Sequence, residues 1–281
     1  MKLVTMTCEC AKRFGDVQAI KMIKAAGFDG YDFSMFGHNE KFWGSDEWRE
    51  YAEELRNTAD KAGIPCLQMH APCPNMRTVE DVVPLEKTFL RSIDIAAILG
   101  CKMLVVHPGS FLSARENKKY IYDKLLPRAK EKGVVLATEN MFKWKDETES
   151  ETVPSACGTA KDFTEHVDCV NDDNFTACMD VGHAEMVNCE GSVEIIKALG
   201  KRIGCLHVHD NDLYYDLHTF PFCGKIKWKE VAKALKSVGY RGNLTFEADD
   251  FMKNYPDELI SACLELLEKT GRYLIELIED A

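Results

Sequence analysis

Short apolar runs rich in β-branched residues alternate along this chain with longer segments in which apolar residues recur every three or four positions. The apolar runs predict eight strands, over Leu3–Thr7, Gly30–Ser34, Pro65–His70, Cys101–His107, Val134–Glu139, Phe175–Asp180, Ile203–Val208 and Asn243–Glu247. The segments between them predict eight helices, over Asp16–Ala26, Ser45–Ala62, Pro84–Leu99, Ala114–Lys132, Thr159–Val170, Ser192–Leu199, Trp228–Val238 and Pro256–Glu279. Pro127, inside the fourth of these helices, predicts a kink or a break there.

Eight alternating strand–helix units are typical of a parallel sheet with right-handed crossovers, and eight is the number that closes a barrel. Such a barrel typically takes about 250 residues, so we expect one (β/α)8-barrel domain over residues 1–281. A doubly wound open sheet is the alternative, but the segment after the first strand, MTCECAKRFG, lacks the glycine-rich turn GxGxxG. The longest loop, Lys143–Gly158, is acidic and rich in Ser and Thr, and is either a lid or a solvated surface loop.

The composition is that of an ordinary globular protein, with 46% hydrophobic and 29% charged residues. The net charge of −11 disfavours nucleic acid as a partner. The N-terminus has no signal-peptide pattern, and no stretch approaches the ~18 apolar residues needed to cross a bilayer. The twelve cysteines form no CxxC pair, which favours reduced, buried thiols such as Cys66, Cys101, Cys178 and Cys205. We therefore expect a cytoplasmic protein with no membrane partner.

The ends of the predicted strands carry the candidate chemistry. Six strands end in a residue that can bind a metal, namely His70, His107, Glu139, Asp180, His207 and Glu247. In a parallel barrel the carboxyl ends of all strands lie on one rim, where catalytic groups collect. Taken singly, a strand-end Glu is more often an ion-pair partner and a strand-end His a packing residue, but six together indicate a functional site. His38 in a loop and His166 on a helix are expected to take no part, with His166 at the surface.

Short motifs at these positions resemble those of the xylose isomerase-like barrels, the superfamily of sugar phosphate isomerases and epimerases that also includes endonuclease IV. The motifs run over nearly the whole chain: HAPC at His70, HPGS at His107, TEN around Glu139, MDVGH ending at His183, HVHD starting at His207, DLH ending at His218 and FEAD around Glu247. Any one of them alone is a weak signal, but their combination in this order is specific.

The resemblance implies one divalent metal ion, held by Glu139, Asp180, His207 and Glu247. Three carboxylates and one imidazole favour Mn²⁺, Mg²⁺ or Co²⁺, and Zn²⁺ is also compatible. His209 is an alternative to His207 as the metal ligand, because residues two apart on a strand face the same way. The family pattern places an Asp three residues after the ligand, which favours His207. Five further residues are assigned to substrate binding: His70, His107, His183, His209 and His218. Asp216 and His218 are assigned to a possible additional metal ion.

Similar epimerases use their two metal-bound glutamates to move a proton next to a carbonyl, so the resemblance implies that Glu139 and Glu247 are catalytic. The predicted function is therefore a metal-dependent sugar or sugar phosphate isomerase or epimerase that acts through an enediolate. A lyase or dehydratase of the same superfamily, acting on an oxidised sugar, begins with the same step and stays open. A sugar- or metal-binding module without activity is the least favoured interpretation.

An endonuclease IV-like function is the main competitor, because that enzyme holds three zinc ions with nine side chains. The chain has a candidate for each: His70, His107, Glu139, Asp180, His183, His207, Asp216, His218 and Glu247. Three features oppose it. The chain is acidic, Cys73 and Pro74 stand where repair enzymes carry bulky wedge residues, and Leu217 replaces an Arg of the repair pattern.

The sequence does not identify the sugar or say whether it is phosphorylated. Four aromatic residues of the rim loops could stack on a sugar ring or pack beneath a loop: Phe36, Phe42, Trp43 and Phe142. The expected partner is a small sugar, and the sequence is compatible with a homo-oligomer.

Overall fold

A computed structural model describes residues 1–36, 39–149, 151–186 and 190–281. Eight parallel strands form one sheet in the order β10, β1, β2, β3, β4, β5, β8, β9. Their bounds are β1 Leu3–Met6, β2 Gly30–Ser34, β3 Cys66–His70, β4 Met103–Val105, β5 Val135–Glu139, β8 Phe175–Asp180, β9 Ile203–His207 and β10 Leu244–Phe246. Val208 N donates to Thr245 O over 2.9 Å and Glu247 N donates to Val208 O over 3.2 Å, which joins the last strands and closes the barrel. The predicted (β/α)8 barrel is confirmed.

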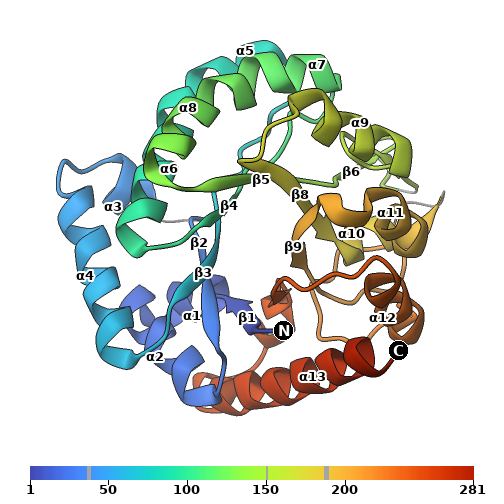
Figure 1. The fold of residues 1–281 in the computed structure, drawn as a ribbon. Coiled ribbons are helices and arrows are strands. Elements are labelled where there is room, and N and C mark those ends of the chain that lie inside the picture. Colours follow the sequence, from blue (N-terminus) through green and yellow to red (C-terminus); the bar gives the residue numbers. More distant parts are fainter. Residues whose placement is uncertain (37–38, 150, 187–189) are drawn as a thin grey trace.

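The helices form a ring around the strands, with α13 running beside β1 between α2 and α12 (Figure 1). Seven of the eight main helices match the predicted ones within a few residues at each end, while α8 begins nine residues after the predicted start at Ala114: α2 Asp16–Ala26, α4 Trp48–Ala62, α6 Glu86–Leu99, α8 Asp123–Lys132, α9 Ala160–Val170, α11 Gly191–Leu199, α12 Trp228–Ser237 and α13 Ile260–Asp280. Four short helices in the connections were not predicted: α1 Cys8–Phe14, α3 Asn39–Trp43, α5 Val79–Val82 and α10 Val181–Met186. A fifth, α7 Ala114–Asn117, forms the start of the predicted fourth helix. The predicted fourth helix is interrupted before Pro127, by a π-helical turn over Lys118–Tyr122, and α8 continues through the proline.

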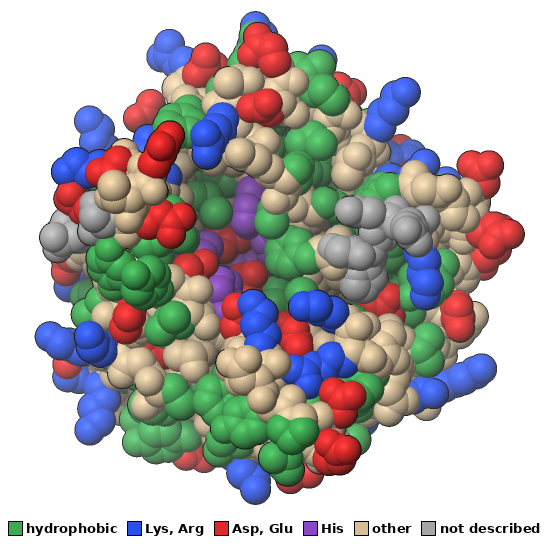
Figure 2. All heavy atoms as spheres, turned by 180° about the vertical axis from the view of Figure 1, so that it is seen from behind, with side chains coloured by type: hydrophobic (Ala, Val, Ile, Leu, Met, Phe, Trp, Pro, Cys, Tyr) green, Lys and Arg blue, Asp and Glu red, His purple; other side chains and the backbone are tan. Residues whose placement is uncertain are grey.

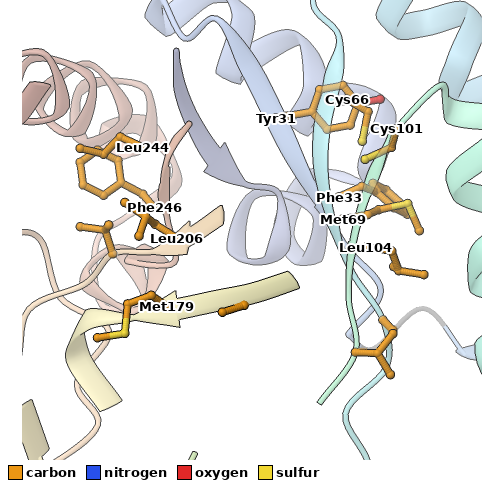
Figure 3. Close-up of a cluster of buried hydrophobic side chains, with 14 of the residues drawn as sticks. Tyr31, Phe33, Cys66, Met69, Cys101, Leu104, Met179, Leu206, Leu244 and Phe246 are labelled. Atoms are coloured by element: carbon orange, nitrogen blue, oxygen red, sulfur yellow. The ribbon is translucent and has the colours of Figure 1, made fainter. Parts of the chain in front are cut away.

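Alternation along the strands divides the apolar residues into two layers. Outward-facing side chains such as Phe33, Met69 and Leu206 pack against the helix ring, and Figure 3 shows part of this layer. A separate small cluster of Val105, Ala137, Cys178 and Cys205 fills the barrel interior. Side chains two positions apart on a strand face the same way. The residue two positions after each member of this cluster therefore also faces the barrel axis, at the carboxyl rim.

The segment Lys143–Gly158, which the sequence predicted as a loop, contains an antiparallel hairpin among its described residues. Its strands are β6 Phe142–Trp144 and β7 Thr152–Pro154. Thr152 Oγ1 donates to Met186 O over 2.5 Å, which ties the hairpin to the end of α10. The hairpin therefore stands over the rim beside β8.

His166 is buried, so the prediction that it lies at the surface is wrong. Its Nε2 lies 3.1 Å from Asn117 Nδ2, and its Nδ1 lies 2.9 Å from Asp162 O. Burial lowers the pKa of His166, but Asp162 and Cys157 outweigh this effect and raise the pKa to about 11. His166 thus joins α9 to α7 in the helix layer, and His38 lies outside the described residues. None of the helices in the described residues is both long and apolar enough to cross a membrane.

Candidate metal centre

Four strand ends bring one imidazole and three carboxylates to a single point at the rim. Glu139 ends β5, Asp180 ends β8, His207 ends β9 and Glu247 directly follows β10. One ligand atom from each of the four lies within 4.8 Å of the others, and all four residues are buried. His207 Nδ1 is 3.0 Å from Glu139 Oε1 and 2.8 Å from Glu247 Oε2, so both glutamates lie against the same ring nitrogen.

Several of these ligand atoms lack a hydrogen bond within the described residues. They include Glu139 Oε1, Asp180 Oδ2, Glu247 Oε2 and both ring nitrogens of His207. A buried polar atom without a partner costs about 1–3 kcal/mol, so a protein seldom leaves several of them in one place. A cation at their common centre would satisfy the three carboxylate oxygens and the Nδ1 of His207, while Nε2 faces Asp32. The donor set therefore fits a divalent metal ion.

The electrostatics keep the glutamates of this group ionised, as metal ligands must be. Burial raises the pKa of Glu139, but the imidazoles of His207 and His107 outweigh burial and lower the pKa well below its usual range. Burial lowers the pKa of His207, but Cys178, Glu139 and Glu247 outweigh it and raise the pKa well above its usual range. Metal binding to His207 needs the neutral ring, so the ion has to displace a proton there.

His70 and His107 form a second group on the other side of Glu139. His70 Nε2 lies 2.9 Å from His107 Nε2, and Glu139 Oε2 lies 3.5 Å from the first nitrogen and 3.1 Å from the second. The Nδ1 of His70 is 2.7 Å from Ala71 O, so Nδ1 carries a proton. This pair faces the same hollow as the central group.

A third group, on the opposite side of Asp180, contains His183, His209, Asp216 and His218. Asp216 lies at its centre, with His218 Nε2 at 2.9 Å, His183 Nε2 at 3.5 Å and His209 Nε2 at 3.6 Å from its carboxylate oxygens. His209 Nε2 is also 3.2 Å from Asp180 Oδ1. The structure thus separates the two competing histidines, with His207 in the central group and His209 in the third. Every site residue named from the sequence is part of one of these three neighbouring groups.

Gly182 makes room for the third group. A Cβ on Gly182 would lie 1.9 Å from His209 Cε1, so any side chain here would displace the imidazole. Gly182 O also accepts a hydrogen bond from Asn211 Nδ2 over 3.0 Å. The glycine of the MDVGH motif is therefore explained by the close approach of α10 to His209.

Asp32, which the sequence analysis missed, lies behind His207. It is buried on β2, and its Oδ2 is 3.6 Å from His207 Nε2. A carboxylate on this side turns Nδ1 of the ring toward Glu139 and Glu247. The available signal was a carboxylate in the middle of the strand GYDFS, where an apolar residue is expected.

Asn140 was also missed, although it follows Glu139 directly in the TEN motif. Its Nδ2 donates to Asp180 O and its Oδ1 accepts from Asp180 N, both over 2.8 Å. Its carbonyl oxygen lies 3.0 Å from His183 Nδ1. Asn140 therefore joins the ends of β5 and β8 and fixes the backbone of Asp180 without using its carboxylate.

Asp210 holds the long connection after β9. Its buried carboxylate accepts four hydrogen bonds: Oδ1 from Asn211 N and Ile226 N over 2.8 and 3.1 Å, and Oδ2 from Phe222 N and Trp228 Nε1 over 2.9 and 2.8 Å. The connection between these anchors carries two members of the third group. The aspartate of the HVHD motif is thus a positioning residue.

We expect Asp210→Ala to lower the free energy of unfolding by about 2–4 kcal/mol, because it leaves buried N–H groups without an acceptor. Urea unfolding measures this loss. Asp212→Ala is the matched control, since Asp212 accepts only the N–H groups of Tyr214 and Tyr215 within the same connection. Equal losses in the two variants would contradict the role given to Asp210.

On the space-filling surface, histidine and acidic side chains lie at the floor of a hollow, with hydrophobic side chains along part of its wall (Figure 2). The hollow opens at the carboxyl ends of the strands. A small polar molecule can therefore reach all three groups from solvent, which fits the place where barrels of this class bind their ligands.

A sequence model of the xylose isomerase-like TIM barrels matches residues 20–270. The chain belongs to this family. It is 28% identical over 166 residues to the uncharacterized protein y4fM of Sinorhizobium fredii, a match that covers 55% of this chain and about half, 50%, of that protein. It is 23% identical over 261 residues to the uncharacterized protein Rv0498 of Mycobacterium tuberculosis, with 89% of each chain covered.

Solved structures with the same fold include sugar epimerases. A D-tagatose 3-epimerase-like protein aligns with a TM-score of 0.68 and 22% identity over 96% of this chain and 99% of its own. The D-allulose 3-epimerase of Methylomonas sp. aligns with a TM-score of 0.70 and 17% identity over 98% of this chain and 97% of its own. At these identities the likeness establishes the fold.

Proposed function

We propose that this protein is a metal-dependent epimerase or isomerase of a small ketose or a related oxidised sugar. The observation that carries the proposal is that Glu139 Oε1 and Glu247 Oε2 lie 3.0 and 2.8 Å from His207 Nδ1, beside one potential metal position. Two carboxylates around one substrate carbon are what a reaction needs if a proton leaves one face and returns to the other. The names of the two structural neighbours, a D-tagatose 3-epimerase-like protein and a D-allulose 3-epimerase, support the same reaction class.

Glu139, Asp180, His207 and Glu247 are the residues that would hold the metal ion. When bound, a divalent ion supplies positive charge that stabilises the negative charge developing on the substrate oxygen. Mn²⁺, Mg²⁺ and Co²⁺ suit the three carboxylates best, and Zn²⁺ also accepts this donor set.

The glutamates carry the proton transfer. One carboxylate removes the proton from the carbon next to the carbonyl, so that the C–H bond electrons move into the enediolate. In an epimerase the other glutamate, ionised at rest, takes up a proton from solvent and passes it to the opposite face of the enediolate. Both groups then exchange protons with solvent. His70, beside Glu139, and His183, beside Asp180, would orient the hydroxyl groups of the substrate.

The direct test is conversion of ketoses by the protein, purified and then supplied with Mn²⁺. D-Tagatose, D-allulose and D-fructose are incubated separately, and the products are separated by chromatography. We expect at least one ketose to give an epimer or an aldose, and EDTA to stop the conversion. No conversion of any sugar in a wide panel of ketoses and ketose phosphates would count against the proposal.

Asp32→Asn tests how the metal position is built. A carboxylate that orients a histidine ligand typically contributes 10–100-fold to metal affinity, and we expect a loss of about this size for Mn²⁺. Isothermal titration calorimetry measures it. Asp29→Asn is the matched control, because Asp29 lies directly before β2 and pairs with Arg272 at the surface. Unchanged affinity in Asp32→Asn would show that the carboxylate does not orient His207.

A zinc-dependent nuclease is the second candidate, and one observation favours it. All nine residues of the trinuclear pattern are gathered into three adjacent groups, with His70 and His107 on one side of Glu139 and His183, Asp216 and His218 beyond Asp180. Metal content separates the two functions. The nuclease predicts three zinc ions per chain and incision of a duplex that contains an abasic site, and the epimerase predicts one essential divalent ion and no incision.

A further inference from the structure

An apolar cavity of about 520 Å³ lies beside the three groups of metal-type residues. It is formed by the connection after β2, the connection after β3, and the start of α6. Its lining includes Met35, Phe36, Trp43, Pro72, Pro74 and Leu85. Among the described residues, no member of the three groups lines this cavity, so it is a different space from the hollow over Glu139 and Glu247.

The cavity and the candidate site are in direct contact. The ring of Phe36 lies 4.5 Å from the ring of His70, so one side chain forms the wall of both spaces. Cys73 also lies in the lining. The cavity and the candidate site therefore meet at Phe36 and His70.

The chemistry of the lining excludes some ligands and favours others. No Lys, Arg, Asp or Glu side chain lines the cavity within the described residues, although 29% of the chain is charged. A phosphate group needs positive charge or several N–H donors, and none of the lining side chains provides positive charge. Aromatic and aliphatic walls instead favour a flat or extended apolar group, and the volume is in the range of 300–1,000 Å³ that is typical of small-molecule sites.

The walls are also pre-formed. Pro72 and Pro74 restrict the backbone on one side. On the other, Arg91 lies over the Trp43 ring at 5.8 Å and donates to Phe42 O over 2.6 Å, which holds the tryptophan in place. A rigid apolar wall loses little entropy when it binds a ligand.

We propose that this cavity binds an apolar aglycone, so that the natural substrate is a sugar carrying an aromatic or aliphatic group rather than a sugar phosphate. The inference rests on the proposed function, since it assumes that the sugar ring lies at Glu139 and Glu247. The apolar group is then placed past Phe36, against Trp43 and Leu85. This cavity, and not the metal centre, would select the substrate.

Binding of three probes with the same sugar ring tests the proposal: phenyl β-D-glucopyranoside, methyl β-D-glucopyranoside and glucose 6-phosphate. Calorimetry reports binding without any turnover. We expect the phenyl glucoside to bind at least about tenfold tighter than the methyl glucoside, a difference of about 1.4 kcal/mol, and glucose 6-phosphate to bind no tighter than the methyl glucoside. Equal affinities for phenyl and methyl glucoside, or a preference for the phosphate, would overturn the proposal.

Two variants locate the effect. Leu85→Asp and Thr88→Glu each place a negative charge in the lining of the cavity. Thr88 is a half-buried polar residue, so its position tolerates a polar side chain and at least this variant should fold. Both should abolish the preference for the phenyl group, while Leu266→Asp on exposed α13 should keep it. Preference retained in folded Leu85→Asp and Thr88→Glu would contradict the assignment. If the proposed function is wrong but this inference is right, the preference for the phenyl group persists and no sugar exchanges hydrogen with solvent.

Discussion

Glu247→Gln should abolish proton transfer while leaving the substrate bound. The change keeps the size of the side chain and one potential ligand oxygen, but it removes the base. General acid–base groups typically contribute 10²–10⁴-fold, so we expect kcat to fall by about that factor with KM changed by much less. Steady-state kinetics on the converted ketose measure both values.

Two controls make this result specific. Glu258→Gln, an exposed glutamate before α13, should leave kcat unchanged. Metal content of Glu247→Gln, measured alongside, separates a lost base from a lost ligand. If the variant retains metal and more than about a tenth of the normal kcat, Glu247 is not the group that moves the proton.

Asp180→Ala should remove the metal without unfolding the chain. Asp180 lies at the end of β8, where its backbone is held by Asn140 and not by its own carboxylate. We expect Mn²⁺ affinity to fall by more than about 100-fold, beyond the 10–100-fold contributed by a residue that only orients a ligand. Elemental analysis after dialysis gives the metal content, and far-ultraviolet circular dichroism reports the fold.

Asp168→Ala is the matched control for this variant, because Asp168 pairs with Arg202 at the surface, away from the rim. Its metal content should equal that of the unmodified protein. Full metal occupancy in Asp180→Ala would remove this residue from the ligand set. This result would favour an ion position nearer to His70 and His107.

The barrel and the meeting of its strand ends could be predicted from the sequence because both follow from local patterns. Helix α2 matches its predicted bounds, because Gly27 ends it in the left-handed conformation, at φ 103°. The gathering of Glu139, Asp180 and His207 follows from topology, since the carboxyl ends of parallel strands meet on one rim. No detail of side-chain packing was needed for either prediction.

The features that were missed depend on contacts between distant parts of the chain. The burial of His166 depends on Asn117 of α7, and nothing in the pattern of α9 indicates that partner. The role of Asp210 depends on N–H groups up to eighteen positions further along the chain. The hairpin of β6 and β7 lies in a polar segment without clear alternation, so its strands gave no periodic signal.

Hydrogen exchange into sugars tests the central claim most directly. The protein, loaded with Mn²⁺, is incubated in deuterated water with a panel of ketoses, ketose phosphates and keto-glycosides, and an abasic duplex is incubated in parallel. We predict deuterium at a carbon next to the carbonyl of at least one sugar, lost with EDTA and lost in Glu247→Gln, and an intact duplex. Incision of the duplex with no deuterium in any sugar would contradict the account and favour the trinuclear zinc nuclease.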